Sequence, residues 1–217
     1  MRLYHFIMNL LFPPRCVLCR RLLEKQETDL CRSCRMEAPS YPHRKRKIQF
    51  LDSFAAVWYY EGTVRASLLR YKFRGARGYA RCYGRILAMK LLEAEPDGFD
   101  LITWVPVSRL RKFRRGYDQV ALLAQAVGQE LGMEPEPVLK KIRHNPQQSR
   151  IRSEAARRAN VLGVYRVENP ELVRGRRILL LDDILTTGAT ASECGKELRL
   201  AQAKEVHCAA VAAARKY

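Results

Sequence analysis

The chain has 217 residues, 47% of them hydrophobic, and carries a formal net charge of +18 with a pI near 10. This length allows one substantial core with a small appendage and excludes a large third unit. The positive charge favours polyanionic partners, either phosphate-rich substrates, nucleic acid or anionic lipid, and does not choose among them.

The apolar run near the N-terminus is short and interrupted. It extends from Leu3 to Phe12, contains Tyr, His and Asn, and is followed by no small-residue cleavage site. A membrane-spanning helix needs about 20 apolar residues. The sequence therefore predicts no secretory signal and no integral membrane segment, and it places the chain in the cytoplasm. Thiols stay reduced there, so metal binding and burial explain the seven cysteines better than disulfides.

Four of the cysteines form two C-x2-C pairs separated by eleven residues: Cys16, Cys19, Cys31 and Cys34. Each pair suits one tight turn, and four thiolates complete a tetrahedral Zn²⁺ site with no open position, which is typical of structural zinc. A redox C-x-x-C is the alternative, and two such pairs in a basic setting disfavour it. Residues 1–40 are predicted to be a zinc-ribbon module whose folding depends on the metal.

A polar, proline-bearing, basic stretch follows, from Pro39 to Lys47. This composition is typical of a linker. We therefore predict three parts: the ribbon at 1–40, a basic linker at 41–50 and a larger domain at 51–217.

Predicted strands and helices alternate through the larger domain. Strands are expected at 52–60, 101–107, 177–181 and 206–214, and helices at 63–73, 79–94, 117–131 and 191–202. Buried strands separated by helices of this length indicate βαβ units. The expected fold class is α/β, with a parallel twisted sheet flanked by helices on both faces. Cys82, Cys194 and Cys208 fall within these elements and are expected to be buried.

An acidic pair and a small-residue loop follow the predicted strand at 177–181. Asp182 and Asp183 lie at its carboxyl end, where open parallel sheets place their ligands. The loop that opens the next helix contains Thr186, Thr187, Gly188, Ala189 and Thr190. Its N–H groups and hydroxyls, together with the helix dipole, form a cradle suited to a phosphate monoester. The acidic pair alone would fit equally well a strand that ends in two solvated aspartates.

The whole string Ile178 to Thr190, ILLLDDILTTGAT, resembles the signature of type I phosphoribosyltransferases. The resemblance implies that Asp182 and Asp183 are the catalytic acids, holding the ribose 2- and 3-hydroxyls of 5-phosphoribosyl-1-pyrophosphate (PRPP). It implies that Thr186 to Thr190 bind the 5-phosphate and that Mg²⁺ accompanies PRPP. In the hypoxanthine-guanine branch an aspartate stands where this chain has Thr186, so a purine-salvage role is disfavoured.

A second anion site is expected after the strand at 101–107. The residues expected to bind pyrophosphate there are Val107, Ser108, Arg109 and Arg111. Composition alone leaves a solvated basic turn as the alternative. The stretch VPVSRLRKFRRGYDQVALLA is similar to ComF-type proteins, the DNA-uptake and competence branch of the superfamily.

A polar segment after residue 145 resembles the loop that closes over PRPP in type I enzymes. Its candidate residues are Gln147, Gln148, Arg152 and Arg158. Composition alone fits an ordinary surface loop as well.

A zinc ribbon joined to a phosphoribosyltransferase-like domain is the ComF architecture, so the resemblance covers nearly the whole chain. It implies a phosphoribosyltransferase, a pentosyl-transferring enzyme that binds Mg-PRPP and acts in DNA uptake, natural transformation or DNA utilisation. Single-stranded DNA and a ComF helicase are the partners that it implies. Two alternatives remain open: a single-stranded DNA-binding accessory protein, and a PRPP-sensing scaffold without turnover.

Overall fold

The computed structural model describes residues 13–42, 47–143 and 159–215. Its central sheet has four parallel strands: β1 (Ser53–Tyr59), β2 (Leu101–Trp104), β5 (Arg177–Leu185) and β6 (Glu205–Ala213). The order across the sheet is β1-β6-β5-β2, so β5 and β6 are central. All but the first residue of β6 are buried, as expected of a strand that is covered on both faces.

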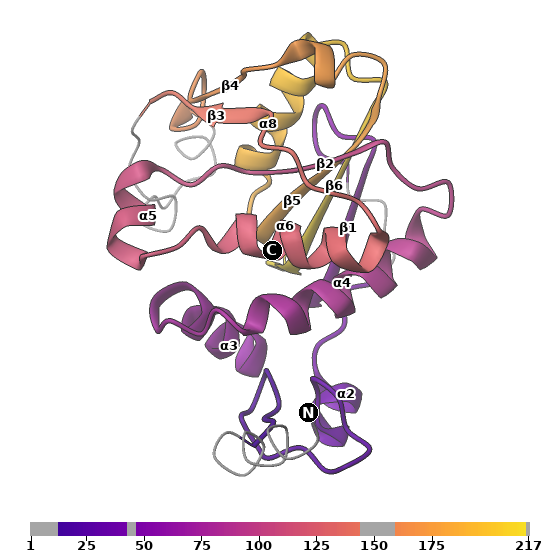
Figure 1. Ribbon diagram of the computed structural model, residues 1–217, viewed down its shortest axis with the longest axis vertical. Coiled ribbons are helices and arrows are strands. Elements are labelled where there is room, and N and C mark those ends of the chain that lie inside the picture. The colour runs from indigo at the N-terminus through magenta and orange to yellow at the C-terminus, as the bar shows by residue number, and fades with distance from the viewer. Residues whose placement is uncertain (1–12, 43–46, 144–158, 216–217) are drawn as a thin grey trace, which may run out of the picture.

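Helices cover both faces of this sheet, as predicted (Figure 1). On one face lie α3 (Gly62–Phe73), α4 (Tyr79–Ala94) and α6 (Gln119–Leu131), and on the other lies α8 (Ala189–Leu200). Alternate residues of β5 separate accordingly. Leu179 and Leu181 pack with the three-helix side, and Ile178 and Leu180 pack with α8. The α/β fold class inferred from the sequence is confirmed.

Two predicted strand ends differ from the structure by more than one residue. The strand expected at 101–107 ends at Trp104, because Pro106 has no N–H with which to continue the ladder. The strand expected at 177–181 continues to Leu185, since β6 pairs with it as far as Ala213. The acidic pair is therefore part of β5 rather than of the loop after it.

Four short elements of the larger domain were not predicted. The basic segment that was expected to bind pyrophosphate, with a solvated turn as the alternative, forms a helix, α5 (Arg109–Arg115), which Ser108 caps and which ends at Gly116 with φ of 72°. β3 (Leu139–Lys141) pairs antiparallel with β4 (Tyr165–Val167) in a separate two-stranded sheet. A 3-10 turn, η2 (Pro170–Leu172), precedes β5.

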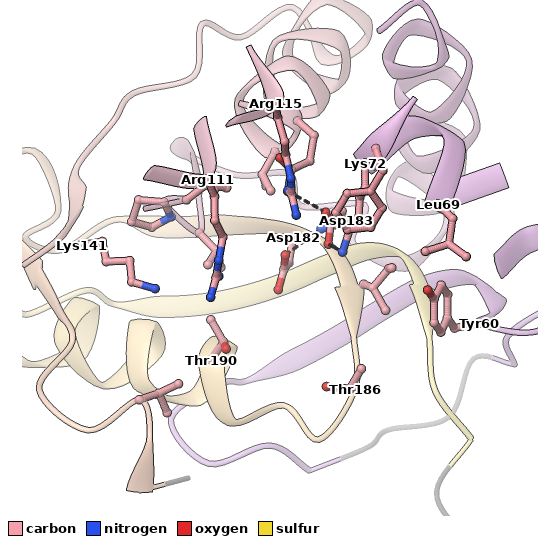
Figure 2. A pocket seen from close by; sticks show the side chains of 18 of the residues that line it. Tyr60, Leu69, Lys72, Arg111, Arg115, Lys141, Asp182, Asp183, Thr186 and Thr190 are labelled. Carbon is pink, nitrogen blue, oxygen red and sulfur yellow. Dashed lines mark hydrogen bonds and ion pairs between the residues drawn. The ribbon is translucent and has the colours of Figure 1, made fainter. Parts of the chain in front are cut away.

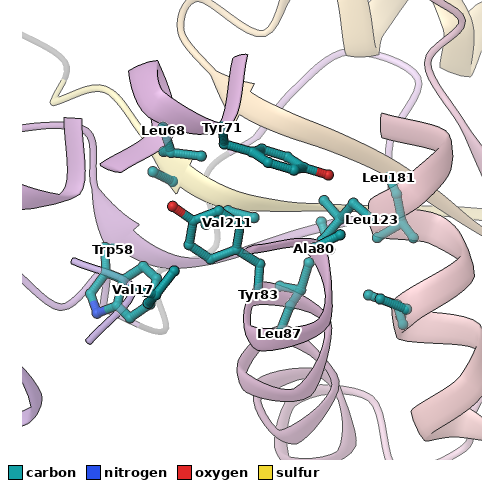
Figure 3. Packing of buried hydrophobic residues seen from close by; sticks show 14 of the residues in the cluster. Val17, Trp58, Leu68, Tyr71, Ala80, Tyr83, Leu87, Leu123, Leu181 and Val211 are labelled. Atoms are coloured by element: carbon teal, nitrogen blue, oxygen red, sulfur yellow. The ribbon is translucent and has the colours of Figure 1, made fainter. Parts of the chain in front are cut away.

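The cysteine-rich segment packs directly against the larger domain. Its described part, residues 13–42, includes the helix α2 (Arg32–Glu37), and its Val17 and Leu18 are 1% exposed within the cluster that α3 and α4 share. Figure 3 shows Val17 beside Trp58 and Tyr83. The ribbon thus contributes to the main core.

Polar contacts fix the same junction. Ser67 Oγ donates to the carbonyl of Val17, and Arg70 Nη2 donates to that of Leu18 at 2.5 Å. The guanidinium of Arg85 makes two hydrogen bonds to Asp29, at 2.9 and 2.5 Å. Burial raises the pKa of Asp29, but this guanidinium outweighs burial and lowers it overall.

Among the described residues, every helix is too short or too polar to cross a membrane.

Candidate active site

A pocket of about 460 Å³ lies at the carboxyl end of the sheet, over β5 (Figure 2). Asp182, Asp183, Thr186 and Thr190 all line it, so the structure brings the predicted acids and loop threonines together. Five cations share its wall: Arg65, Lys72, Arg111, Arg115 and Lys141. The rest of the lining is mostly apolar or aromatic, and Figure 2 places Tyr60 and Leu69 at the end near Thr186.

Asp183 is buried, at 3% exposure, and donors from two helices hold its carboxylate. Lys72 Nζ on α3 lies 2.8 Å from Oδ1, and Gln119 Nε2 on α6 donates to Oδ2 at 3.1 Å. A buried carboxylate needs such partners because desolvation disfavours its charge. The acid is thus rigidly placed at the pocket floor.

Asp182 shares its surroundings with a second negative charge. Its Oδ1 accepts a hydrogen bond from the backbone N–H of Asp183 at 2.8 Å. Burial, with the adjacent Asp183 carboxylate adding to it, raises the pKa of Asp182 to about 8, although Lys72 opposes the rise. The pair therefore holds a proton more readily than a solvated carboxylate does.

The loop after β5 forms a small recess at the start of α8. Asp182 and the residues from Ile184 to Ala191 line a space of about 20 Å³ there, roughly enough for one small group. Gly188 has φ of 86°, and a Cβ at this position would lie 3.4 Å from Ile48, so glycine suits both the turn and the packing. Thr187 Oγ1 accepts from the N–H of Ala189 at 3.3 Å. The N-terminus of a twelve-residue helix thus opens at this recess, where the helix dipole favours an anion.

The predicted pyrophosphate residues are divided between two positions. Val107 and Arg111 line the pocket, and burial lowers the pKa of Arg111. Ser108 is 7% exposed and does not line the pocket; its hydroxyl accepts from the N–H of Arg111 at 3.4 Å, at the start of α5. The side chain of Arg109 lies outside the described residues. So do Gln147, Gln148, Arg152 and Arg158, the residues of the predicted closing loop.

A second, smaller pocket of about 240 Å³ adjoins the first and shares Lys72, Phe73, Arg111 and Arg115 with it. We call it the cationic pocket. It is lined by Lys72, Phe73, Gly75, Arg111, Arg114, Arg115 and Tyr117. Among these described lining residues there is no carboxylate, so its charge is positive throughout and an anion is the ligand that it suits.

Several pocket residues were missed by the sequence reading: Tyr60, Arg65, Lys72, Gln119 and Lys141. Gln119 lies within the stretch VPVSRLRKFRRGYDQVALLA, whereas the other four come from elements outside the predicted motifs. Burial, with Arg111 contributing, lowers the pKa of Lys141 to about 8. Asp118 caps the helix that carries Gln119, since its Oδ1 accepts from the N–H groups of Val120 and Ala121.

The cysteine quartet forms a separate cluster. The Sγ atoms of Cys16, Cys19, Cys31 and Cys34 all lie within 4.8 Å of one another, with Cys19 and Cys31 at 3.6 Å. Tetrahedral Zn–S bonds of about 2.3 Å place sulfurs about 3.8 Å apart, so the donor set fits zinc.

Three of these thiols have shifted pKa values, one lowered and two raised, and all lie close to the other sulfurs. Burial raises the pKa of Cys16, but N–H groups at Cys19, Cys31 and Leu18 outweigh it, and the pKa falls to about 7. Burial and the neighbouring thiols raise the pKa of Cys34. Four thiolates this close need a cation between them. Of the other cysteines, Cys194 and Cys208 are buried as predicted, whereas Cys82 is only partly buried.

Two domain families match the sequence. A double zinc ribbon domain matches residues 7–45, and a phosphoribosyl transferase domain matches residues 121–217, the part that contains β5, its loop and α8. The chain is thus built from a four-cysteine zinc ribbon followed by a domain with the phosphoribosyltransferase-like fold.

Several relatives align with this chain over most of their length. Competence protein F of Haemophilus influenzae is 26% identical over 218 residues, which cover 88% of this chain and 93% of that protein. DNA utilization protein YhgH of Escherichia coli K12 is 27% identical, covering 84% and 83%. Competence protein ComFC of Bacillus subtilis is 26% identical, covering 81% and 67%. The chain belongs to this ComF/YhgH family.

Among solved structures, a Bacillus subtilis glutamine PRPP amidotransferase complexed with ADP and GMP is similar, with 23% identity and a TM-score of 0.45. The match covers 64% of this chain and 30% of the amidotransferase chain. The topology described above stands independently of it.

Proposed function

We propose that this protein binds PRPP together with Mg²⁺ and transfers the phosphoribosyl group to an acceptor during DNA uptake or utilisation. In this proposal Asp182 and Asp183 accept hydrogen bonds from the ribose 2- and 3-hydroxyls. The loop from Thr186 to Thr190 binds the 5-phosphate at the start of α8. Arg111, with Val107 and its neighbours, faces the pyrophosphate.

One observation carries the proposal: the acidic pair and the threonine loop open into the same pocket as five cations. A sugar that bears a phosphate at one end and a pyrophosphate at the other needs acceptors for its hydroxyls and cations for its phosphates, and it needs them close together. Buried aspartates alone would suit a structural role, and a basic pocket alone would suit any anion. Their combination favours a phosphorylated sugar.

The residues also fit a magnesium ion that arrives with the substrate. Carboxylate oxygens of Asp182 and Asp183 are the hard ligands that Mg²⁺ prefers. The ion would neutralise pyrophosphate charge as this group leaves. The protein's own contribution is to place the ribose against the pair, to hold both anionic ends, and to leave the apolar end near Tyr60 and Leu69 for an acceptor.

The relatives' names support the biological setting. Proteins called competence protein F and DNA utilization protein align with most of this chain, so DNA handling is the context that we propose for the reaction. We also propose that the ribbon occupies residues 1–40 and that residues 51–217 fold as the transferase domain. A cytoplasmic location would keep the zinc thiols reduced.

Pyrophosphate release tests the reaction itself. The protein, PRPP and Mg²⁺ are incubated with candidate acceptors, including nucleobases and single-stranded oligonucleotides, and free pyrophosphate is measured. Acceptor-dependent release is expected, and Asp183→Asn should abolish it. PRPP binding without release for any acceptor would instead indicate a sensor that does not turn over.

The affinity for PRPP is expected to rise with pH. Because the pKa of Asp182 is raised to about 8, the pair holds a proton below that pH, and hydroxyl donors bind the deprotonated form. Affinity should therefore increase from pH 6 towards pH 8 by up to about tenfold per unit and level off above it. The charged or titratable groups that interact with the pair from other elements include Lys72, Tyr71, Arg111, Asp118, Tyr165, Cys194 and Cys208.

Calorimetric titration of PRPP at several pH values measures this slope. The Asp182→Asn variant is the control, because any dependence of its PRPP affinity on pH comes from titration of the phosphates of PRPP itself. Identical slopes for the natural protein and Asp182→Asn would contradict the assignment of the proton to the acidic pair.

A second candidate function is single-stranded DNA binding, favoured by the surface of α5. Phe113 is 86% exposed and Phe73 is 56% exposed, beside the arginines of the cationic pocket. Exposed aromatics among cations are typical of surfaces that stack bases and follow a phosphate backbone.

Its test is the salt dependence of oligonucleotide binding. Phe113→Ala with Arg114→Ala should weaken binding about tenfold and flatten the salt dependence, while Arg81→Ala on α4 should change it little. Absence of binding at low salt would exclude this function.

A further inference from the structure

Lys72 occupies the position between the two pockets. It lies in the last turn of α3, its side chain is 18% exposed, and its Nζ is 2.8 Å from Asp183 Oδ1 (Figure 2). Gln119 holds the other oxygen. The protein's own donors therefore engage both oxygens of the acid on which ribose hydroxyls are proposed to bind.

The backbone that carries Lys72 is firmly held. The neighbouring Tyr71 is fully buried, its O–H donates to the carbonyl of Gln119 at 2.5 Å, and Tyr117 donates to the carbonyl of Tyr71. Any movement of the ammonium must therefore come from the four-carbon side chain, which is flexible in lysine.

The cationic pocket next to the acidic pair offers a place to which the Lys72 ammonium can move. Lys72 lines both the main pocket and the cationic pocket. In the main pocket it meets two carboxylates, whereas the described lining of the cationic pocket contains arginines and aromatics and no carboxylate. An anion at the boundary would attract the ammonium away from Asp183, provided that something else satisfies that acid.

We propose that Lys72 is an internal counter-ion of the acidic pair, that the ribose displaces it, and that its ammonium then contacts the pyrophosphate of the same ligand. The inference rests on the proposed function, since it assigns a role within the PRPP site. Ribose hydroxyls take over Asp183, and the freed cation moves towards the leaving group, where negative charge accumulates.

Two fragments of PRPP separate this role from a structural one. Ribose 5-phosphate uses the acidic pair and the threonine loop, whereas pyrophosphate added without Mg²⁺ uses the cations. Lys72→Gln removes the competitor for Asp183 and the contact with pyrophosphate together. Calorimetry should show pyrophosphate binding weakened about tenfold or more, and ribose 5-phosphate binding unchanged or tighter. Lys72→Arg should restore most of the pyrophosphate affinity.

Lys90→Gln is the matched control, because it makes the same change on α4 and lines neither pocket. Lys72→Met, with an apolar side chain of similar length, makes the same test if the glutamine variant does not fold. Equal loss of both fragments would show that Lys72 only supports the pair, and no loss of either would show that it has no role; each result overturns the inference. If the natural protein binds neither PRPP nor its fragments, the proposed function itself fails.

Discussion

Replacing Cys16 and Cys31 together by serine is expected to lower the melting temperature of the whole chain by at least about 10 °C. The reason is that the ribbon shares the main core. Without zinc the four sulfurs lose their common ligand, and Val17 and Leu18, which are 1% exposed, lose the turn that holds them against α3 and α4. Circular dichroism during heating measures the effect, and a zinc chelator should reproduce it.

The consequence should reach the candidate active site. Ser67 and Arg70 of α3 donate to the carbonyls of Val17 and Leu18, and Lys72 of the same helix meets Asp183. PRPP affinity should therefore fall along with stability. Cys82→Ser is the control, since Cys82 lies on α4 outside the quartet. If the variant instead showed two separate unfolding transitions, and the upper one lay at the melting temperature of the unsubstituted protein, the ribbon would fold independently of the larger domain.

Replacing Asp182 and Asp183 together by asparagine is expected to weaken PRPP binding by roughly 100-fold or more. A hydrogen bond to a charged group contributes about 1.5–3 kcal/mol, and at least two are lost with this pair. An amide can still accept from a hydroxyl, but it carries no charge for Mg²⁺ or for Lys72. Calorimetric titration with PRPP and Mg²⁺ measures the change.

Asp97→Asn supplies the comparison, because this carboxylate is 83% exposed and lines neither pocket. Its PRPP affinity should equal that of the natural protein. An unchanged affinity in the double asparagine variant would mean that the acidic pair does not hold the ligand.

The parts of the candidate site that could be predicted from the sequence are those whose residues are contiguous in the chain. The acidic pair and the loop from Thr186 to Thr190 occupy nine consecutive residues, from 182 to 190, so composition and order carried their chemistry. The metal site of the cysteine quartet could be predicted for the same reason, because its four residues follow a short, regular spacing. In both cases the structure brings together residues that a short spacing had already linked.

The residues whose roles could not be predicted from the sequence are those that tertiary packing brings into place. Lys72 lies 111 residues before Asp183, and in sequence it is one of the chain's 40 basic residues. Arg70 and Arg85 are equally inconspicuous, although they fasten the ribbon to α3 and α4. Helix α5 was missed because RLRKFRR has too few apolar residues to show a helical period, and only its caps indicated it.

The most direct test of the central claim is the melting temperature of the natural protein with and without PRPP and Mg²⁺. A ligand that binds only the folded state stabilises it by about 2.7 kcal/mol at 100 times its dissociation constant. Saturating PRPP with Mg²⁺ should therefore raise the melting temperature by a few degrees. The double asparagine variant should show no such rise. No rise in the natural protein, or an equal rise in both proteins, would contradict the assignment of this pocket to PRPP.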